Sequence, residues 1–95
     1  MSTPTEVARA VAARARALRL LRDLSQEGLA ASAGVSLGSL KRFERTGAIA
    51  FASLIRIAVA LDATAELETW FIPPPFRSID DALARQIPRL RGRRK

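Results

Sequence analysis

Hydrophobic residues near the start of the chain recur at the spacing of an amphipathic helix. In residues 5–23, Val7, Val11, Leu18 and Leu21 repeat at helical intervals, and alanines fill many of the positions between them. This period predicts a helix with its apolar side facing inward. The charged side of the same helix is expected to carry Arg9, Arg14, Arg16, Arg19 and Arg22.

Two shorter apolar patterns follow, each introduced by a serine. Ser25 has the side chain of an N-cap, so a helix is predicted from there to about residue 33. Gly34 can adopt the positive φ that ends such a helix. Ser36 is the corresponding N-cap of the next helix, which residues 46–47 close. The chain therefore places two short helices on either side of a tight turn.

The second half of the chain continues with helical patterns until prolines interrupt it. Residues 51–61 predict a fourth helix, and residues 64–71 a short fifth one. The inward side of the fourth helix is expected to contain Leu54, Ile57, Ala58 and Leu61. Prolines 73–75 end the fifth helix, and a capping signal predicts a last short helix over 78–86. No stretch alternates as a strand, so the predicted fold class is all-α.

Composition and charge limit the partners that this chain can have. Its 95 residues are expected to form one domain, and its net charge of +7 favours nucleic acid over an anionic membrane surface. Residues 1–61 carry +5, residues 62–87 carry −3 and residues 88–95 carry +5. Histidine, cysteine and tyrosine are absent, so we expect no metal, no cofactor and no enzyme activity. No apolar run is long enough for a signal peptide or a spanning helix, which predicts a cytoplasmic protein.

The two short helices have the residue types that a helix-turn-helix needs. Helices that cross at a wide angle require a small residue at their contact, and Ala30 provides it. Gly34 suits the turn, while Leu40 and Phe43 anchor the second helix from behind. The opposite side of that helix is then free to enter a DNA major groove, which is about 12 Å wide. This free side comprises Leu37, Gly38, Ser39, Lys41, Arg42 and Arg45.

The run SQEGLAASAGVSLGSLKRFERTG, followed by SLIRIAVALDA, resembles the XRE family of phage-repressor-like regulators. The resemblance implies a five-helix repressor-like helix-turn-helix domain over residues 1–72. The prolines and the charge pattern then predict a Pro-rich break and short helix over 73–87 and a basic tail over 88–95. The resemblance also implies binding of double-stranded DNA. The DNA-contacting positions that it implies are Gln26, Ser36, Leu37, Gly38, Ser39, Lys41, Arg42 and Arg45.

The resemblance assigns roles to these positions one by one. Gln26 would contact a phosphate and would brace the helix that follows Ser36, which is the one expected to enter the major groove. Leu37 and Gly38 fall where base edges are most often reached, although neither side chain can hydrogen-bond a base. Lys41 and Arg42 follow one turn later on the same face, and guanine is a natural partner for the arginine.

The remaining charged positions of the second helix are assigned in the same way. Arg45 lies where the family often contacts the DNA backbone. Glu44 is expected to pair inside the protein with Arg56 or Arg22 and not to meet DNA. Among the charged residues of this helix, only the cations are therefore expected to contact DNA.

Besides the apolar Leu37 and Gly38, which has no side chain, two further positions depart from the family pattern. Gly28 stands where an acid would complete a capping box with Ser25, so that box is lost. Ala50 stands where a serine often caps the fourth helix, so that helix is expected to start without a side-chain cap.

A narrower similarity is to the HipB-like antitoxins, which are encoded beside HipA-like kinase toxins. It implies a homodimer that binds an inverted repeat in its own promoter and that also binds the kinase. Other members of the superfamily stay open as alternatives: phage repressors, restriction-modification controllers and regulators of other toxin-antitoxin pairs. A further alternative is a platform for protein partners that has the same fold and has lost specific DNA binding.

Two segments outside the motif each have two interpretations. The basic tail is either an arm that tracks phosphates or a solubilising end, and it contains Arg89, Arg91, Arg93, Arg94 and Lys95. The aromatic segment is either a dimer or partner surface or the last part of the core. Its candidate residues are Leu67, Trp70, Phe71, Ile72 and Phe76.

Overall fold

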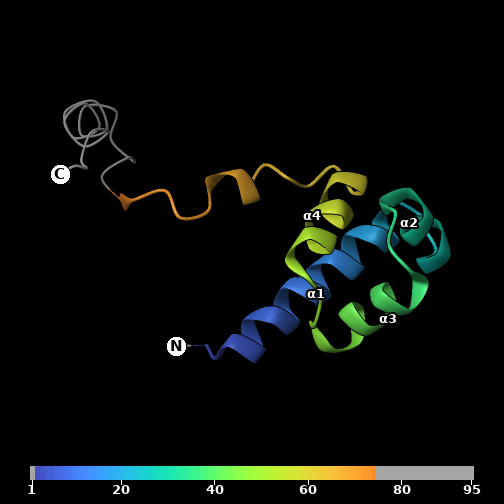
Figure 1. Cartoon of the computed structure of the whole chain (residues 1–95), viewed down its shortest axis with the longest axis horizontal. Helices are drawn as coiled ribbons and strands as arrows, with labels where there is room; N and C mark the ends of the chain where they lie inside the picture. Colours follow the sequence, from blue (N-terminus) through green and yellow to red (C-terminus); the bar gives the residue numbers. More distant parts are fainter. Residues whose placement is uncertain (1, 75–95) are drawn as a thin grey trace. The chain divides into compact units, whose positions relative to one another are not determined.

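The computed structural model describes residues 2–74, and all regular secondary structure in that range is helical, which confirms the predicted all-α class. The helices are α1 (Pro4–Leu21), α2 (Gln26–Ala33), α3 (Leu37–Thr46) and α4 (Phe51–Ala60), followed by the 3₁₀ helix η1 (Leu67–Thr69) (Figure 1). Of the described residues, 2–65 pack as one unit, and residue 66 begins a second unit. The predicted helix over 78–86 and the basic tail lie outside the described residues.

The fifth helix predicted over residues 64–71 is reduced to the single turn of η1. Trp70, which follows η1, is extended with ψ of 138°, and Phe71 has a positive φ of 67°. The next residue, Ile72, precedes a proline, and such a residue is pushed away from helical angles. The prolines therefore end the helical pattern earlier than the spacing of apolar residues predicts.

Helix α1 begins with a capping box that the sequence interpretation missed. The Thr3 hydroxyl accepts a hydrogen bond from the Glu6 amide at 3.1 Å, and the Glu6 carboxylate accepts one from the Thr3 amide at 2.8 Å. Pro4 is the first helical residue, where its missing amide hydrogen costs nothing. These contacts fix where α1 begins.

The starts of the other helices agree with the prediction. Ser25 Oγ accepts from the Gly28 amide at 2.9 Å, and Ser36 Oγ accepts from the Ser39 amide at 3.0 Å. Ser25 therefore caps α2 with its side chain, although Gly28 cannot supply the second hydrogen bond of a capping box. Ala50 precedes α4 without a side-chain cap, as the sequence predicts.

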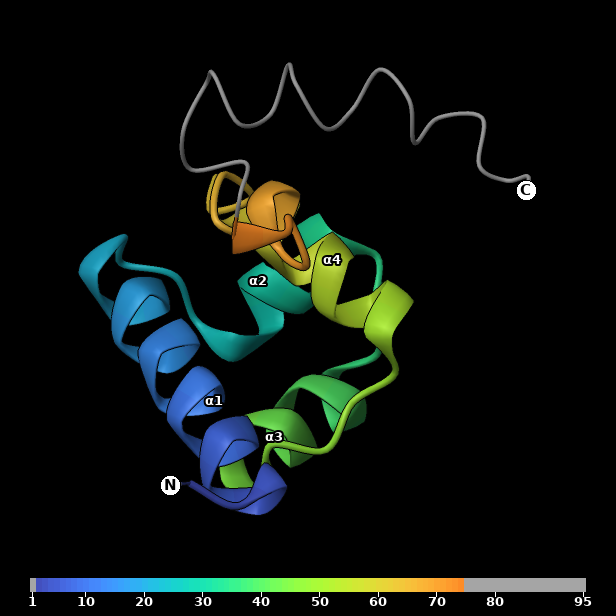
Figure 2. The same ribbon diagram turned by 90° about the vertical axis from the view of Figure 1, so that its left-hand side faces the viewer.

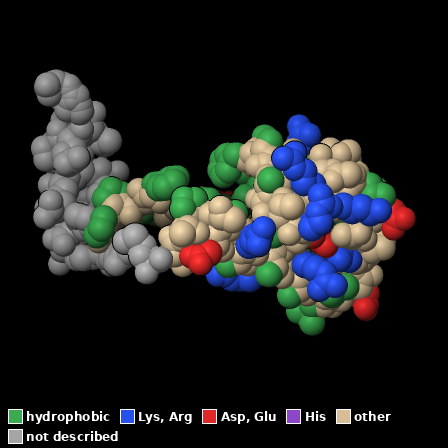
Figure 3. Space-filling model, turned by 90° about the horizontal axis from the view of Figure 1, so that it is seen from below, with side chains coloured by type: hydrophobic (Ala, Val, Ile, Leu, Met, Phe, Trp, Pro, Cys, Tyr) green, Lys and Arg blue, Asp and Glu red, His purple; other side chains and the backbone are tan. Residues whose placement is uncertain are grey.

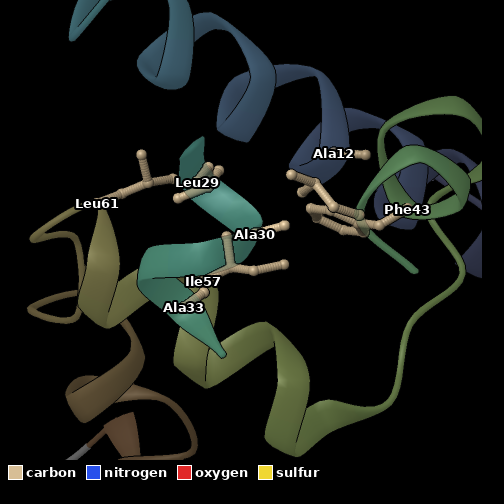
Figure 4. Packing of buried hydrophobic residues seen from close by; sticks show 8 residues of the cluster. Ala12, Leu29, Ala30, Ala33, Phe43, Ile57 and Leu61 are labelled. Atoms are coloured by element: carbon tan, nitrogen blue, oxygen red, sulfur yellow. The ribbon is translucent and has the colours of Figure 1, made fainter. Parts of the chain in front are cut away.

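Helix α2 supplies the centre of the core. The buried cluster consists of Ala12, Leu29, Ala30, Ala33, Leu40, Phe43, Ile57 and Leu61. In Figure 4, Leu29 and Ala30 of α2 lie between Leu61 on one side and Ala12 and Phe43 on the other. Full burial of a side chain such as Phe43 stabilises the fold by about 1.5–3 kcal/mol. The prediction that Ile57, Ala58 and Leu61 of α4 face inward is confirmed, and Leu54 is partly buried.

The inward side of α1 differs from the prediction. Ala12 is buried, and Val11 and Leu18 pack partly against the core, but Val7 is half exposed and Leu21 is 79% exposed. The alanine decides this orientation because a small side chain lets α3 come close. The arrangement also turns one predicted surface arginine inward, as described below.

Two glycines at helix ends have left-handed backbone angles, with φ of 72° at Gly34 and 84° at Gly47. A β-carbon at Gly34 would meet open space. One at Gly47 would lie only 2.7 Å from the carbonyl carbon of Ala8, so the end of α3 rests directly on the backbone of α1. In Figure 2, α3 lies beside the N-terminal part of α1. Gly47 therefore positions α3 as well as ending it.

Candidate nucleic-acid interface

The turn between α2 and α3 is held by backbone hydrogen bonds. The Gly34 amide donates to carbonyl oxygens of the last turn of α2, and the Val35 amide donates to the Ala30 carbonyl at 3.1 Å. Val35 is partly buried against the core, and Ser36 then caps α3. This closed turn sets the angle at which α3 leaves α2.

One side of α3 faces the core and the other faces solvent. Leu40 and Phe43 are buried, so they fix the rotation of the helix about its axis. Because successive helical residues are about 100° apart, positions 38, 42 and 45 fall within roughly 60° of one another on the outward side. The exposed residues of this outward side are Gly38, Ser39, Lys41, Arg42 and Arg45.

The outward side of α3 is strongly basic. Within residues 2–74, the side chains of Lys41, Arg42 and Arg45 make no ion pair with a carboxylate. Figure 3 looks at the molecule from below the view of Figure 1, the side on which α3 lies, and shows many Lys and Arg side chains with few acids. These charges are therefore available to an anionic partner.

The first turn of α3 presents few side-chain atoms. Leu37 is partly buried and packs against the core, although the sequence placed it on the free side of the helix. A β-carbon at Gly38 would have no atom within 4 Å, so the backbone is bare there. The Ser36 hydroxyl donates to the Ser39 hydroxyl at 2.8 Å. A ligand can approach the helix backbone closely at this point.

A buried ion pair joins α1 to α3. Arg19 Nε lies 2.7 Å from Glu44 Oε2, and Arg19 Nη2 donates to Glu44 Oε1 at 3.0 Å. Arg19 Nη1 donates to the Leu24 carbonyl at 2.8 Å, and the Gln26 amide nitrogen donates to Glu44 Oε1 at 3.0 Å. Arg19 is only 6% exposed, and such two-pronged contacts are among the strongest hydrogen bonds in proteins.

This network, which we call the Arg19–Glu44 network, corrects two sequence predictions. Arg19 was expected on the charged face of α1, and Glu44 was expected to pair with Arg56 or Arg22; both predictions are wrong. The burial of Arg19 could have been predicted from its spacing in the sequence, because Arg19 follows Ala12 by seven positions and therefore lies on the same side of the helix. The expected bracing role of Gln26 agrees with its hydrogen bond to α3.

The aromatic segment is exposed in this structure. Phe71 is 95% exposed, Trp70 and Ile72 are about half exposed, and Leu67 is partly buried. The rings of Trp70 and Phe71 meet edge to face with centroids 6.3 Å apart. These residues belong to the second unit, so the choice between a dimer or partner surface and the last part of the core stays a prediction. Phe76 and the five basic tail residues lie outside the described part of the chain.

The structure also exposes apolar side chains on α4 that the sequence interpretation missed. Phe51, Ile55 and Val59 follow one another at four-residue intervals, and each is exposed. The sequence could have indicated this surface, because Phe51, Ile55 and Val59 form a second apolar repeat next to the repeat of inward-facing residues of α4. Across the described residues, no helix is long and apolar enough to cross a membrane.

A short helix, a closed turn through a left-handed glycine and a second helix with a basic outward side define a helix-turn-helix domain. The comparison with protein families agrees, because residues 16–67 match the HTH_3 family, described as helix-turn-helix. The match covers more than half of the chain, and the protein belongs to this family, which confirms the XRE-type resemblance. It is therefore a DNA-binding transcription regulator. A search of curated proteins finds no match.

Proposed function

We propose that the protein is a sequence-specific repressor that binds an inverted repeat as a homodimer, with α3 in the major groove. The observation that supports this best is the outward side of α3, where Lys41, Arg42 and Arg45 lack carboxylate partners within the described residues. The Arg19–Glu44 network supports it further, because a helix that selects bases must be held in one orientation. Two-fold symmetry of the dimer would place half-sites about 34 Å apart.

Each predicted contact residue has a role in this proposal. Lys41 and Arg42 contact base edges, and Arg45 contacts a phosphate. Gln26 uses one amide proton for Glu44 and has a second for a phosphate. Ser36, Leu37 and Ser39 lie with Gly38 at the start of α3, where the backbone is open to close approach. We include these four residues in the proposed contact surface.

A selection of bound duplexes from a random pool tests this function. Purified full-length protein would be used at two salt concentrations. Enrichment of an inverted repeat, with affinity that falls steeply as salt rises, is the expected result, because arginine–phosphate contacts release counterions. An unenriched pool that is retained only at low salt would refute sequence-specific binding.

The exposed aromatic segment supports dimerisation. We assign the dimer surface to Leu67, Trp70, Phe71, Ile72 and Phe76. A phenylalanine that is 95% exposed at positive φ is unfavourable alone, and burial against a second copy would offset this cost. Phe71→Ser should therefore shift the sedimentation equilibrium toward monomer, whereas Ile55→Ser on α4 should not. Loss of the dimer in Ile55→Ser alone would move the interface to α4.

A role as the HipB-like antitoxin of a HipA-like kinase toxin is the more specific form of this proposal. The resemblance of the SLGSLKRFERTG run supports it, and the exposed aromatic segment offers a surface for a protein partner. Stable co-purification with the product of a neighbouring gene tests this role. Without such a partner, the remaining candidate is a phage or restriction-modification regulator that acts alone. As a regulator of DNA, the protein is expected to act in the cytoplasm.

The basic tail extends the proposal beyond the helix-turn-helix. We expect Arg89, Arg91, Arg93, Arg94 and Lys95 to track phosphates beside the site that α3 occupies. Removal of residues 88–95 should reduce the slope of affinity against salt concentration, because fewer counterions are released. An unchanged slope would make the tail a solubilising end.

A further inference from the structure

We propose that α3 selects guanine, because the side of the helix that faces solvent offers hydrogen-bond donors and no carboxylate or amide acceptor. This inference rests on the proposed function and specifies the bases that it requires. It follows from where each polar group of α3 is held, not from the charge of the helix alone.

The single carboxylate of α3 is unavailable to a ligand. The Glu44 side chain is 4% exposed, and its two oxygens accept hydrogen bonds from Arg19 and Gln26. The Thr46 hydroxyl is also occupied, because it donates to the Arg42 carbonyl at 2.8 Å and accepts from the Ala48 amide at 3.1 Å. The outward side is left with Ser39, Lys41, Arg42 and Arg45.

The hydrogen bond between two serines directs the proton of Ser39 away from the helix start. Ser36 Oγ accepts from the Ser39 amide and donates its own proton to Ser39 Oγ. Within the described residues, no protein acceptor takes the hydroxyl proton of Ser39. Ser39 therefore keeps its hydroxyl proton as a donor toward solvent. The charged groups of Lys41 and Arg42 are donors that have no acceptor atom at all.

Donors select bases by the acceptors that the major groove displays. Guanine displays two adjacent acceptors, N7 and O6, which match the fork of an arginine. Thymine displays only one acceptor, O4, beside its methyl group, and adenine and cytosine each display an amino group that the charged side chains of α3 cannot accept. Gln26 has an acceptor oxygen, but it lies on α2, and the first helix of such a motif crosses the DNA backbone. A guanine opposite Arg42 is therefore the expected anchor of each half-site.

The test replaces single guanines in a duplex selected by the full-length protein. Replacing guanine with 7-deazaguanine removes N7 and keeps base pairing, whereas replacing it with inosine keeps N7 and O6 and removes only the minor-groove amino group. We expect 7-deazaguanine at one position per half-site to weaken binding at least about 5-fold, and inosine there to change it little.

A matched pair of variants assigns that guanine to a side chain. Arg42→Ala should bind more weakly and should no longer distinguish guanine from 7-deazaguanine at the critical position. Arg45→Ala, whose expected contact is a phosphate, should bind more weakly but keep that distinction. Both side chains are exposed, so equal thermal unfolding of the two variants serves as the control for folding.

The outcomes separate this inference from the function on which it rests. A selected inverted repeat that tolerates 7-deazaguanine at every position would overturn guanine selection and leave the regulator intact. The same distinction retained by Arg42→Ala would also overturn the assignment. A pool with no enriched sequence would overturn both.

Discussion

Replacing Glu44 with leucine removes the acceptor that α1 and α2 share on α3. Arg19 would lose the partner of two of its nitrogens and would stay in a site where it is 6% exposed. Gln26 would lose its amide contact as well. The side chain of Glu44 makes no other interaction among the described residues, so the substitution tests this network.

The expected cost is large for a domain of this size. Removal of one partner from a buried ion pair destabilises a protein by about 3–5 kcal/mol, because the other charge stays buried. At roughly 0.05–0.15 kcal/mol per residue, a unit of about 65 residues has a total stability of roughly 3–10 kcal/mol. Glu44→Leu should therefore remove a large part of the stability of the domain, from roughly a third at the upper end of that range to all of it at the lower end.

The double variant Arg19→Met with Glu44→Leu should recover most of that stability. Apolar replacements of buried ion pairs are often neutral. Recovery should be incomplete, because the Leu24 carbonyl would lose the donor that Arg19 Nη1 provides, which costs about 1–3 kcal/mol if no water replaces it. Both energies would be measured as free energies of unfolding in urea, followed by circular dichroism at 222 nm.

Two results would refute this reasoning. One is a Glu44→Leu variant as stable as the unchanged protein, which would mean that Arg19 reaches solvent easily. The other is a double variant whose destabilisation equals the sum of the two single variants, which would mean that the pair does not interact. Glu27→Leu, an acid on α2 whose side chain is exposed and makes no ion pair among the described residues, is the matched control and should change stability little.

Three further predictions follow from the glycines and arginines of the motif. Gly34→Ala should destabilise the fold by about 1–2 kcal/mol, because alanine is strained at the positive φ of this residue. Gly47→Ala should destabilise it by about 1–3 kcal/mol more, because its β-carbon would also meet the backbone of α1, and equal free energies of unfolding in urea would contradict this close contact. Gly38→Ala should stabilise α3 by about 1 kcal/mol yet weaken operator binding, and unchanged binding in a titration would show that DNA does not approach the bare backbone. Arg42→Ala should cost about 1–3 kcal/mol in operator affinity and relax selectivity at one base pair. Arg45→Ala should weaken the binding of all duplexes alike and lower the slope of affinity against salt concentration by about one, so the same selectivity profile for both variants would argue against the assignment of Arg42 to a base.

Local signals predicted the helix-turn-helix well because each one acts within a few residues. Ser25 and Ser36 cap the helices that follow them, and Gly34 takes the left-handed angle that the turn requires. The inward positions Leu40 and Phe43 are buried, which leaves the predicted cations on the outside. The exposure of the candidate site thus follows from the sequence, whereas the DNA contacts of its residues stay predictions.

The errors concern features that depend on distant parts of the chain. Valine and leucine are more hydrophobic than alanine, so the pattern favoured Val7 and Leu21 as the inward side of α1. The close approach of α3 decided otherwise, and Ala12 became the contact. Arg19 was placed at the surface because its partner lies 25 positions away, and no periodicity connects them. The helix predicted over residues 64–71 is reduced to one turn because a proline disfavours helical angles in the residue before it, an effect that the spacing of apolar residues does not include.

The burial of Glu44 also determines the charge that α3 presents to DNA. Two unit charges about 4 Å apart interact by roughly 1 kcal/mol in water and roughly 4 kcal/mol near a protein surface. A carboxylate on the outward side would repel nearby phosphates by energies of that order and would accept hydrogen bonds from cytosine or adenine. Arg19 prevents both, because it holds Glu44 inside and balances its charge. An arginine of α1, outside the two helices of the motif, therefore keeps the one carboxylate of α3 away from the outward side, and the proposed preference for guanine depends on this.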